Sequence, residues 1–203
     1  MGTMPIPKLL LTMSGPMMIS MFIQALYNVV DSMFVSYISE AALTAVSLAY
    51  PMQNLMIAVA TGTGVGVNAL LSRNLGEKNY SMANRVAGNA IFLGLVSYVV
   101  FALLGLLGSR FYFSVQVEDP NIIALGHDYL SIVTVLSIGC FGQVLLSRLL
   151  QSTGKTFYSM VIQMVGAGLN LVLDPIMIFG LLGFPKMGVA GAALATVISQ
   201  LAG

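Results

Sequence analysis

Two carboxylic acids lie inside long apolar stretches of the sequence, where a charged side chain is costly. Asp31 stands within Q-A-L-Y-N-V-V-D-S-M-F-V, and Asp174 ends the run L-N-L-V-L-D. A carboxylate in apolar surroundings needs a proton, a cation or a basic partner to offset its lost hydration. Two such acids that meet can share a proton or hold a sodium ion, while a hydrogen-bonded structural acid is the simpler alternative. The expected chemistry is reversible binding of a proton or small cation.

Each acid stands on a polar face of a predicted helix. At about 100° per residue, Gln24, Asn28 and Asp31 fall on one narrow face, with Tyr27 at its edge. The other faces of that segment are apolar. A polar stripe on an otherwise apolar helix indicates that the stripe faces other helices or a cavity. We therefore expect these side chains to line a cavity beside the acid.

A second polar face carries Gln163, Asn170 and Asp174, with Asn170 one turn before the acid. Gln163 is a further candidate for lining the cavity. Pro175 follows the acid and removes the helical donor of an earlier carbonyl, which becomes available to a cation or a water. The last apolar segment adds Thr196 at a comparable depth, although threonine in a membrane helix usually bonds its own backbone.

The composition requires that these elements lie in a membrane. The chain has 203 residues, of which 58% are hydrophobic and 7% are charged, whereas soluble domains carry about 25% charged residues. A span needs about 20 apolar residues, so the fold class is an all-α integral membrane protein. Six segments qualify as spans: 9–36, 42–70, 84–108, 124–150, 156–181 and 187–203. The sixth ends at Gly203 without a basic flank, which suggests a piece of a longer protein.

The basic residues predict the orientation of the six spans. The side of the amino terminus receives most of them, namely Lys8, Arg73, Lys78, Arg85, Arg148 and Lys155, and the other side receives Arg110 and Lys186. Cytoplasmic loops carry the excess of lysine and arginine, so the amino terminus is expected in the cytoplasm. Both acids then share a depth in the outer half of the bilayer. None of the basic residues lies in that half, so a salt bridge is not expected.

Several function classes are disfavoured by composition. A net charge of +1 gives no electrostatic case for nucleic acid, and a single cysteine and a single histidine do not suit a transition-metal site. No organic cofactor is indicated. An intramembrane aspartyl protease would also use two acids, but the G-x-G-D motif of such enzymes is absent. We therefore expect a transporter and not an enzyme.

The sequence resembles the MATE (multidrug and toxic compound extrusion) family of transporters, especially its bacterial members. The resemblance extends over nearly the whole chain and rests on several motifs together. These are P-I-P-K-L-L-L-T-M-S-G-P, A-L-Y-N-V-V-D-S-M-F-V, A-L-T-A-V-S-L-A-Y-P-M-Q, G-V-G-V-N-A-L-L-S-R-N-L-G-E-K, L-N-L-V-L-D-P and G-V-A-G-A-A-L-A-T-V-I-S-Q.

The resemblance implies a twelve-helix transporter built from two six-helix lobes, of which this chain is the amino-terminal one. It implies export of amphipathic, often cationic drugs across a bacterial plasma (inner) membrane in exchange for sodium ions or protons. By motif, Asp31, Asn170, Asp174 and Thr196 match the family's cation site, and Pro16 matches a helix-bending proline. The carboxy-terminal lobe is missing from the chain.

Two alternatives stay open within the membrane class. Related lipid or polysaccharide flippases often place arginines in a central cavity to meet phosphates, and the sequence puts no arginine at mid-membrane. The chain is alternatively a non-transporting half that needs a partner chain. The polar faces around Asp31 and Asp174 argue against a purely structural role.

Overall fold

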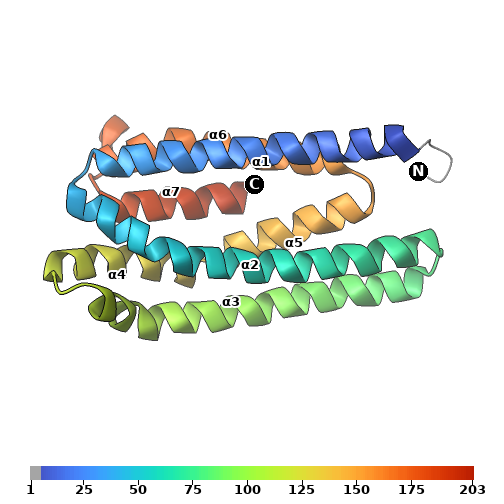
Figure 1. Ribbon diagram of the computed structural model, residues 1–203, viewed down its shortest axis with the longest axis horizontal. Coiled ribbons are helices and arrows are strands. Elements are labelled where there is room, and N and C mark those ends of the chain that lie inside the picture. The colour runs from blue at the N-terminus through green and yellow to red at the C-terminus, as the bar shows by residue number, and fades with distance from the viewer. Residues whose placement is uncertain (1–5) are drawn as a thin grey trace.

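The computed structural model describes residues 6–203, and every regular element in that range is a helix (Figure 1). The elements follow one another as a series of rods joined by short turns. In chain order they are α1 (Ile6–Ser36), α2 (Glu40–Gly76), α3 (Tyr80–Gln116), α4 (Pro120–Val135), α5 (Ile138–Ser152), α6 (Thr156–Phe179), the short 3-10 helix η1 (Leu181–Gly183) and α7 (Val189–Ala202).

Four helices, α1, α2, α3 and α6, are long and apolar enough to cross a membrane. The helices α4 and α5 together make a fifth candidate, bent by 44° at the break between them, and α7 is a shorter apolar helix. Large apolar side chains such as Leu103 and Leu107 on α3 point outward and are exposed. In a bilayer those positions face lipid, so their exposure is favourable there.

The break between α4 and α5 divides the segment 124–150, which the sequence predicted as one span. The hydroxyl of Thr134 donates to the carbonyl oxygen of Leu130 at 2.6 Å, and a threonine that bonds back to its own helix tends to bend it. The next residues leave the regular ladder, since the amide of Ser137 bonds to Thr134 instead of one turn further back. The bend tilts α5 relative to α4 and sets how α5 lies against α2 and α7.

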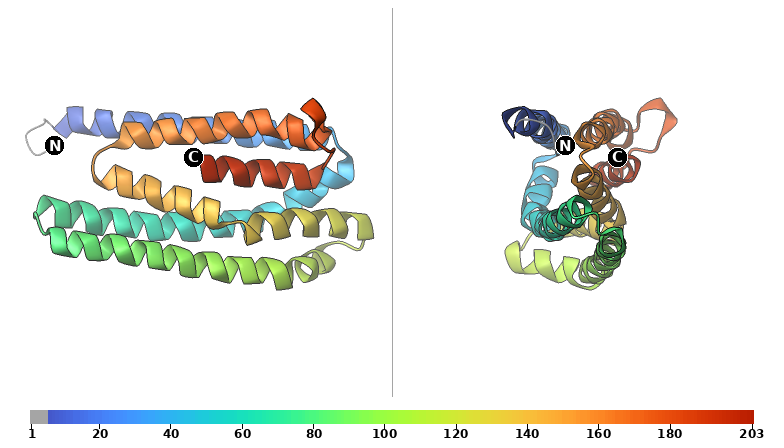
Figure 2. Two further views of the ribbon diagram at one scale, coloured as in Figure 1. Left: turned by 180° about the vertical axis from the view of Figure 1, so that it is seen from behind. Right: turned by 90° about the vertical axis from the view of Figure 1, so that its right-hand side faces the viewer.

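The helices form two groups that share one interior. α1 packs against α6 and α6 against α7, while α2 packs against α3, α4 and α5, and α4 and α5 also contact α7 (Figures 1 and 2). The buried side of α2 includes small residues at helical spacing, among them Ala42, Ala45, Ala49 and Ala60. Small residues let helix backbones approach closely, which is the usual basis of packing where lipid removes the hydrophobic driving force.

The turn after α6 places α7 along the same helix. Gly180 ends α6 with φ of 74°, a conformation that glycine adopts without strain. The amides of Met187 and Gly188 then donate to the carbonyls of Met177 and Ile178 at 3.1 and 3.2 Å. Gly191 lies directly against the backbone of Met177. These contacts make α7 run back along α6, with its small residues against it.

The two ends of the bundle differ in charge. The start of α1, the α2–α3 turn and the α5–α6 turn lie together at one end (Figure 1), which we call the basic end because Arg73, Lys78, Arg85 and Lys155 lie there. The α1–α2, α3–α4 and α6–α7 connections lie at the opposite end. The sequence grouped the basic residues in the same way. The side chain of Lys8 lies outside the described part of the structure.

Candidate functional site

The two apolar-segment acids meet in the structure. α1 and α6 lie side by side (Figure 1), and the carboxyl groups of Asp31 and Asp174 are within hydrogen-bonding reach of each other. Asp174 is only 1% exposed, and Asp31 is half-buried. Two ionised carboxylates repel one another, so this arrangement favours a proton or a cation between them.

Asn170 completes the acid cluster, which we define as Asp31, Asn170 and Asp174. Its side-chain Nδ2 donates to Oδ1 of Asp174 at 3.3 Å, one turn along α6. Three buried oxygens of the cluster have no hydrogen-bond partner among the described residues, namely Asp31 Oδ1, Asn170 Oδ1 and Asp174 Oδ2. Buried polar oxygens are rarely left unsatisfied, so the cluster has the donor set of a site for a proton or a hard cation.

Thr196 approaches the cluster from α7. Gly191 lies against Met177 and Gly166 against the carbonyl of Ser199, so Thr196 faces the intervening stretch of α6, which contains Asn170. Its hydroxyl donates to the carbonyl oxygen of Ala192 at 3.0 Å, the backbone bond that the sequence led us to expect. The hydroxyl oxygen still has lone pairs to offer a cation, so the bond does not remove Thr196 from a cation site.

A cavity of about 200 Å³ opens next to Asn170 and Thr196. Three of the four side chains predicted to line a cavity do so, namely Gln24, Tyr27 and Gln163. Asn28 does not line it: its side chain is exposed, and its backbone carbonyl accepts a bond from Ser32 at 2.9 Å. Around the helix axis, Tyr27 lies about 40° to one side of Asp31 and Asn28 about 60° to the other, and the cavity lies on the Tyr27 side.

One polar residue near the acids, Tyr129, was not singled out by the sequence. Tyr129 on α4 is almost fully buried, and its hydroxyl accepts a bond from Nε2 of Gln53 on α2 at 3.1 Å. Tyr129 lies close enough to Asp31 to interact with its charge. A tyrosine in an apolar segment is no signal by itself. Only the packing of α4 against α2 reveals its bond to Gln53.

One arginine, near the basic end of α5, also lines the cavity. Arg148 on α5 contributes to the cavity wall together with Gln143, Ser147 and Gln151. A long cationic side chain can extend along a wall from near a helix end. The described lining residues of the cavity thus include a cation and no acid.

Pro16 lies inside α1, which continues through it as one helix from Ile6 to Ser36. The structure thus shows no break at this proline. Within residues 6–203, no group of three or more His, Cys, Asp or Glu side chains gathers as a metal site would require. The acid cluster offers two carboxylates and one amide oxygen. This ligand set suits a proton or a sodium ion better than a transition metal.

Known proteins resemble the chain over nearly all of its length. It is 32% identical over 207 residues to a protein named FAD transporter from Shewanella oneidensis, covering 97% of this chain and 44% of that protein. It is 28% identical to the multidrug export protein MepA of Staphylococcus aureus, covering 98% of this chain and 43% of MepA. The chain thus spans less than half the length of these relatives.

Solved structures show the same arrangement of helices. An outward-facing multidrug resistance MATE family transporter of the MOP superfamily superposes with a TM-score of 0.88 at 31% identity, covering 95% of this chain and 42% of that one. A MATE crystal structure in the bent conformation superposes with a TM-score of 0.87 at 30% identity. The fold is therefore the six-helix lobe of such transporters, with α4 and α5 as one broken rod. The family model named MatE matches residues 16–176, and the chain belongs to the MatE family.

Proposed function

We propose that this lobe couples the export of amphipathic solutes to reversible binding of a proton or sodium ion at Asp31 and Asp174. The observation that carries the proposal is the acid cluster, in which three oxygens from two helices converge without hydrogen-bond partners in the described structure. MepA is by name a multidrug export protein, which supports efflux as the process served by the coupling site.

The cluster has the position of a switch between helices. Asp31 belongs to α1 and Asp174 to α6, so the free energy of the α1–α6 contact depends on what lies between the carboxyl groups. A bound cation or proton removes the repulsion and holds the two helices together, whereas an empty ionised pair favours their separation. A change in the α1–α6 contact reshapes the adjacent cavity and biases the lobe between two arrangements.

We further propose that the lobe works with a second, carboxy-terminal lobe in a bacterial plasma membrane, with its amino terminus in the cytoplasm. The chain covers 43% of the length of MepA, which supports a missing half. The clustering of basic residues at the end that holds the start of α1 supports the orientation. A cationic drug that uses the same acids would compete with the coupling ion.

The relatives' names do not settle the solute, since one is a FAD transporter and another a multidrug export protein. The flippase alternative calls for arginines in a central cavity, and one arginine, Arg148, lines this cavity from near the basic end of α5. A lipid-linked diphosphate carries more negative charge than one guanidinium offsets, and Arg148 is the one cation among the lining residues. Drug-like solutes are therefore the better fit.

The substitution Asp31→Asn tests the coupling site in the complete two-lobe transporter. It keeps the size of the side chain and removes the charge, so we expect drug efflux to fall by at least about tenfold while expression and membrane insertion stay normal. The matched control is Glu40→Gln, which neutralises an exposed acid at the start of α2. Normal ion-coupled efflux by Asp31→Asn would contradict the proposal.

The coupling ion is decided by efflux measured under separate sodium and proton gradients. A sodium site predicts efflux driven by sodium alone at constant pH, with loss of that response in Asp31→Asn. A proton site predicts efflux driven by a proton gradient in the absence of a sodium gradient, with loss of that response in Asp31→Asn. In either case the Glu40→Gln control retains the wild-type response.

A further inference from the structure

The cavity has one charged feature, which lies at some distance from the two acids. Arg148 is the only charged side chain among the described residues that line it. Arg148 connects through Gln151 to Ser159 on α6, and at 1.5 Å per residue Ser159 lies about 22 Å along α6 from Asp174. A single coupling ion cannot contact both regions, so Arg148 is free to serve a different group.

The course of the Arg148 side chain depends on the absence of a side chain at one position of the neighbouring helix α2. Its side-chain stem lies over Gly64 of α2, and a Cβ at that position would come within 2.8 Å of Arg148 Cγ. Gly62 and Gly66, on either side, have nothing within 4 Å of such a Cβ. Gly64 is buried whereas its two neighbours are exposed. Of these three glycines, only Gly64 is required for the course of the arginine.

The guanidinium group is oriented by an amide and not by an acid. Nη1 of Arg148 donates to Oε1 of Gln151 at 2.9 Å, and Nε2 of Gln151 donates to Oγ of Ser159 at 3.0 Å. Gln151 and Ser159 are both buried, so the amide is fixed with its oxygen toward the arginine. The described residues thus provide an acceptor for one of the five N–H donors of Arg148.

No carboxylate balances this charge. Across the described residues the structure contains one ion pair, which joins Arg73 to Glu77 on the surface of α2. A half-buried guanidinium with a fixed orientation, free donors and no counter-ion has the geometry that binds a planar carboxylate through two parallel hydrogen bonds. The other lining residues near it, Gln143, Ser147 and Gln163, are neutral donors and acceptors, which matches a ligand with one negative charge.

We propose that Arg148, positioned by Gly64 and Gln151, binds the carboxylate of a transported zwitterionic solute. The inference rests on the proposed function, because it names the solute group that the exporting lobe recognises. It also changes the expected competition: a carboxylate held at Arg148 does not contend with the coupling ion for Asp31 and Asp174. A solute with both charges is accommodated with its carboxylate toward the basic end.

The test uses two dyes that differ by one charge, a rhodamine with a free benzoate and its methyl ester. Efflux of each is measured in cells that express the complete transporter, and binding of each to the purified protein is measured by fluorescence polarisation. For Arg148→Gln we expect the affinity and export of the free acid to fall by about tenfold or more, with the ester changed by less than about twofold. Arg148→Lys keeps the charge but removes the two parallel N–H donors of the guanidinium group, so it should give an intermediate loss of affinity for the free acid.

Two glycine variants provide the positioning control. Gly64→Ala displaces the arginine stem and should weaken the free acid selectively, in the same direction as Arg148→Gln. Gly62→Ala should leave both dyes unchanged, because its added methyl group meets nothing. The ester also reports whether each variant is folded and inserted.

Equal losses of both dyes in Arg148→Gln would show that the arginine has a structural role and would overturn the proposal, as would unchanged binding of the free acid. Export of neither dye by the wild type would contradict the proposed export function. The binding arm then still decides on Arg148, since a difference between acid and ester that vanishes in Arg148→Gln supports the carboxylate site independently of transport.

Discussion

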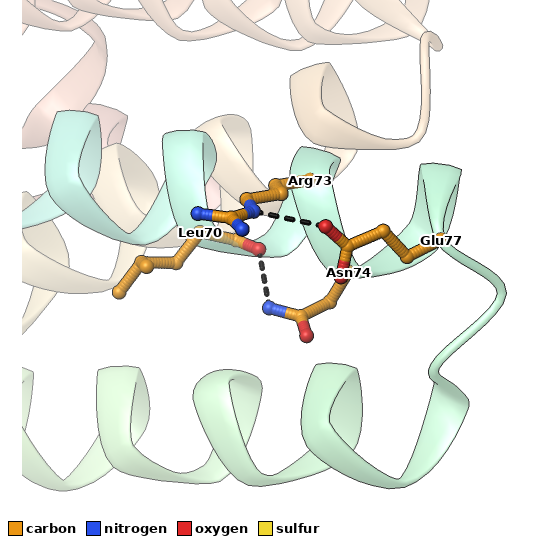
Figure 3. A network of polar contacts seen from close by, with 4 residues as sticks. All are labelled: Leu70, Arg73, Asn74 and Glu77. Atoms are coloured by element: carbon orange, nitrogen blue, oxygen red, sulfur yellow. Dashed lines mark hydrogen bonds and ion pairs between the residues drawn. The ribbon is translucent and has the colours of Figure 1, made fainter.

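Two pairs of charged side chains in this lobe obey opposite rules. At the basic end of α2, Nε of Arg73 bonds to Oε1 of Glu77 at 3.0 Å, with side chains 76% and 55% exposed, beside an amide of Asn74 that caps the carbonyl of Leu70 (Figure 3). In the interior, Asp31 is half-buried and Asp174 is buried, and no lysine or arginine among the described residues forms an ion pair with either acid. The first pair has opposite charges and is exposed to solvent. The two carboxylates of the second pair repel each other when both are ionised.

The contrast distinguishes surface charges with little effect on stability from interior charges that need a functional explanation. An exposed pair one helical turn apart contributes about 0.3–0.5 kcal/mol, because water already solvates both groups. A buried carboxylate without a partner costs several kcal/mol unless it is neutralised, so its presence has to be explained by a ligand or by function. Removing each charge should therefore have effects of very different size.

The largest effect is expected at Asp174. In the wild type, a coupling ion that binds the folded state stabilises it by about 2.7 kcal/mol at a hundred times its dissociation constant. The substitution Asp174→Asn removes the charge that binds the ion and also the repulsion with Asp31. We expect the variant to be as stable as the wild type, or more stable, in ion-free buffer at neutral pH. It should gain less stability than the wild type when sodium is added or the pH is lowered, because only Asp31 remains to bind either ion.

Thermal unfolding of the purified two-lobe protein, followed with and without each ion, measures this response. Asp119→Asn is the control, because Asp119 is an exposed acid at the start of α4. A wild-type ion response in Asp174→Asn would show that the acid cluster is not the coupling site.

The sequence was sufficient for the acids and insufficient for their surroundings. Asp31 and Asp174 stand out because a carboxylate in an apolar segment is rare, and equal depth follows from counting along two helices that run the same way. The lining role of Arg148 depends on the helix break at Thr134 and on the gap at Gly64, which are tertiary features. The burial of Tyr129 against Gln53 and the outward position of Asn28 likewise depend on which helix packs on which side.

An intermediate effect is expected at Thr196. Its hydroxyl already bonds to Ala192 in its own helix, so it offers a cation only a weak additional ligand. We expect Thr196→Ala to reduce the apparent affinity for the coupling ion by about two- to tenfold, up to about 1.4 kcal/mol, and Thr196→Ser to restore it. The half-saturating ion concentration for efflux gives the measurement. An unchanged value in Thr196→Ala would place the threonine outside the ion's coordination.

The smallest effect is expected at the exposed pair. The substitution Arg73→Gln breaks the bond to Glu77 but leaves both positions in solvent. The free energy of unfolding should therefore change by no more than about 0.5 kcal/mol. In high salt, which screens the pair in the wild type, this difference between variant and wild type should disappear. Ion-coupled efflux should remain as in the wild type. A large loss of efflux with normal insertion would mean that Arg73 takes part in transport, and the distinction between paired surface charges and unpaired interior charges would fail as a guide to function in this lobe.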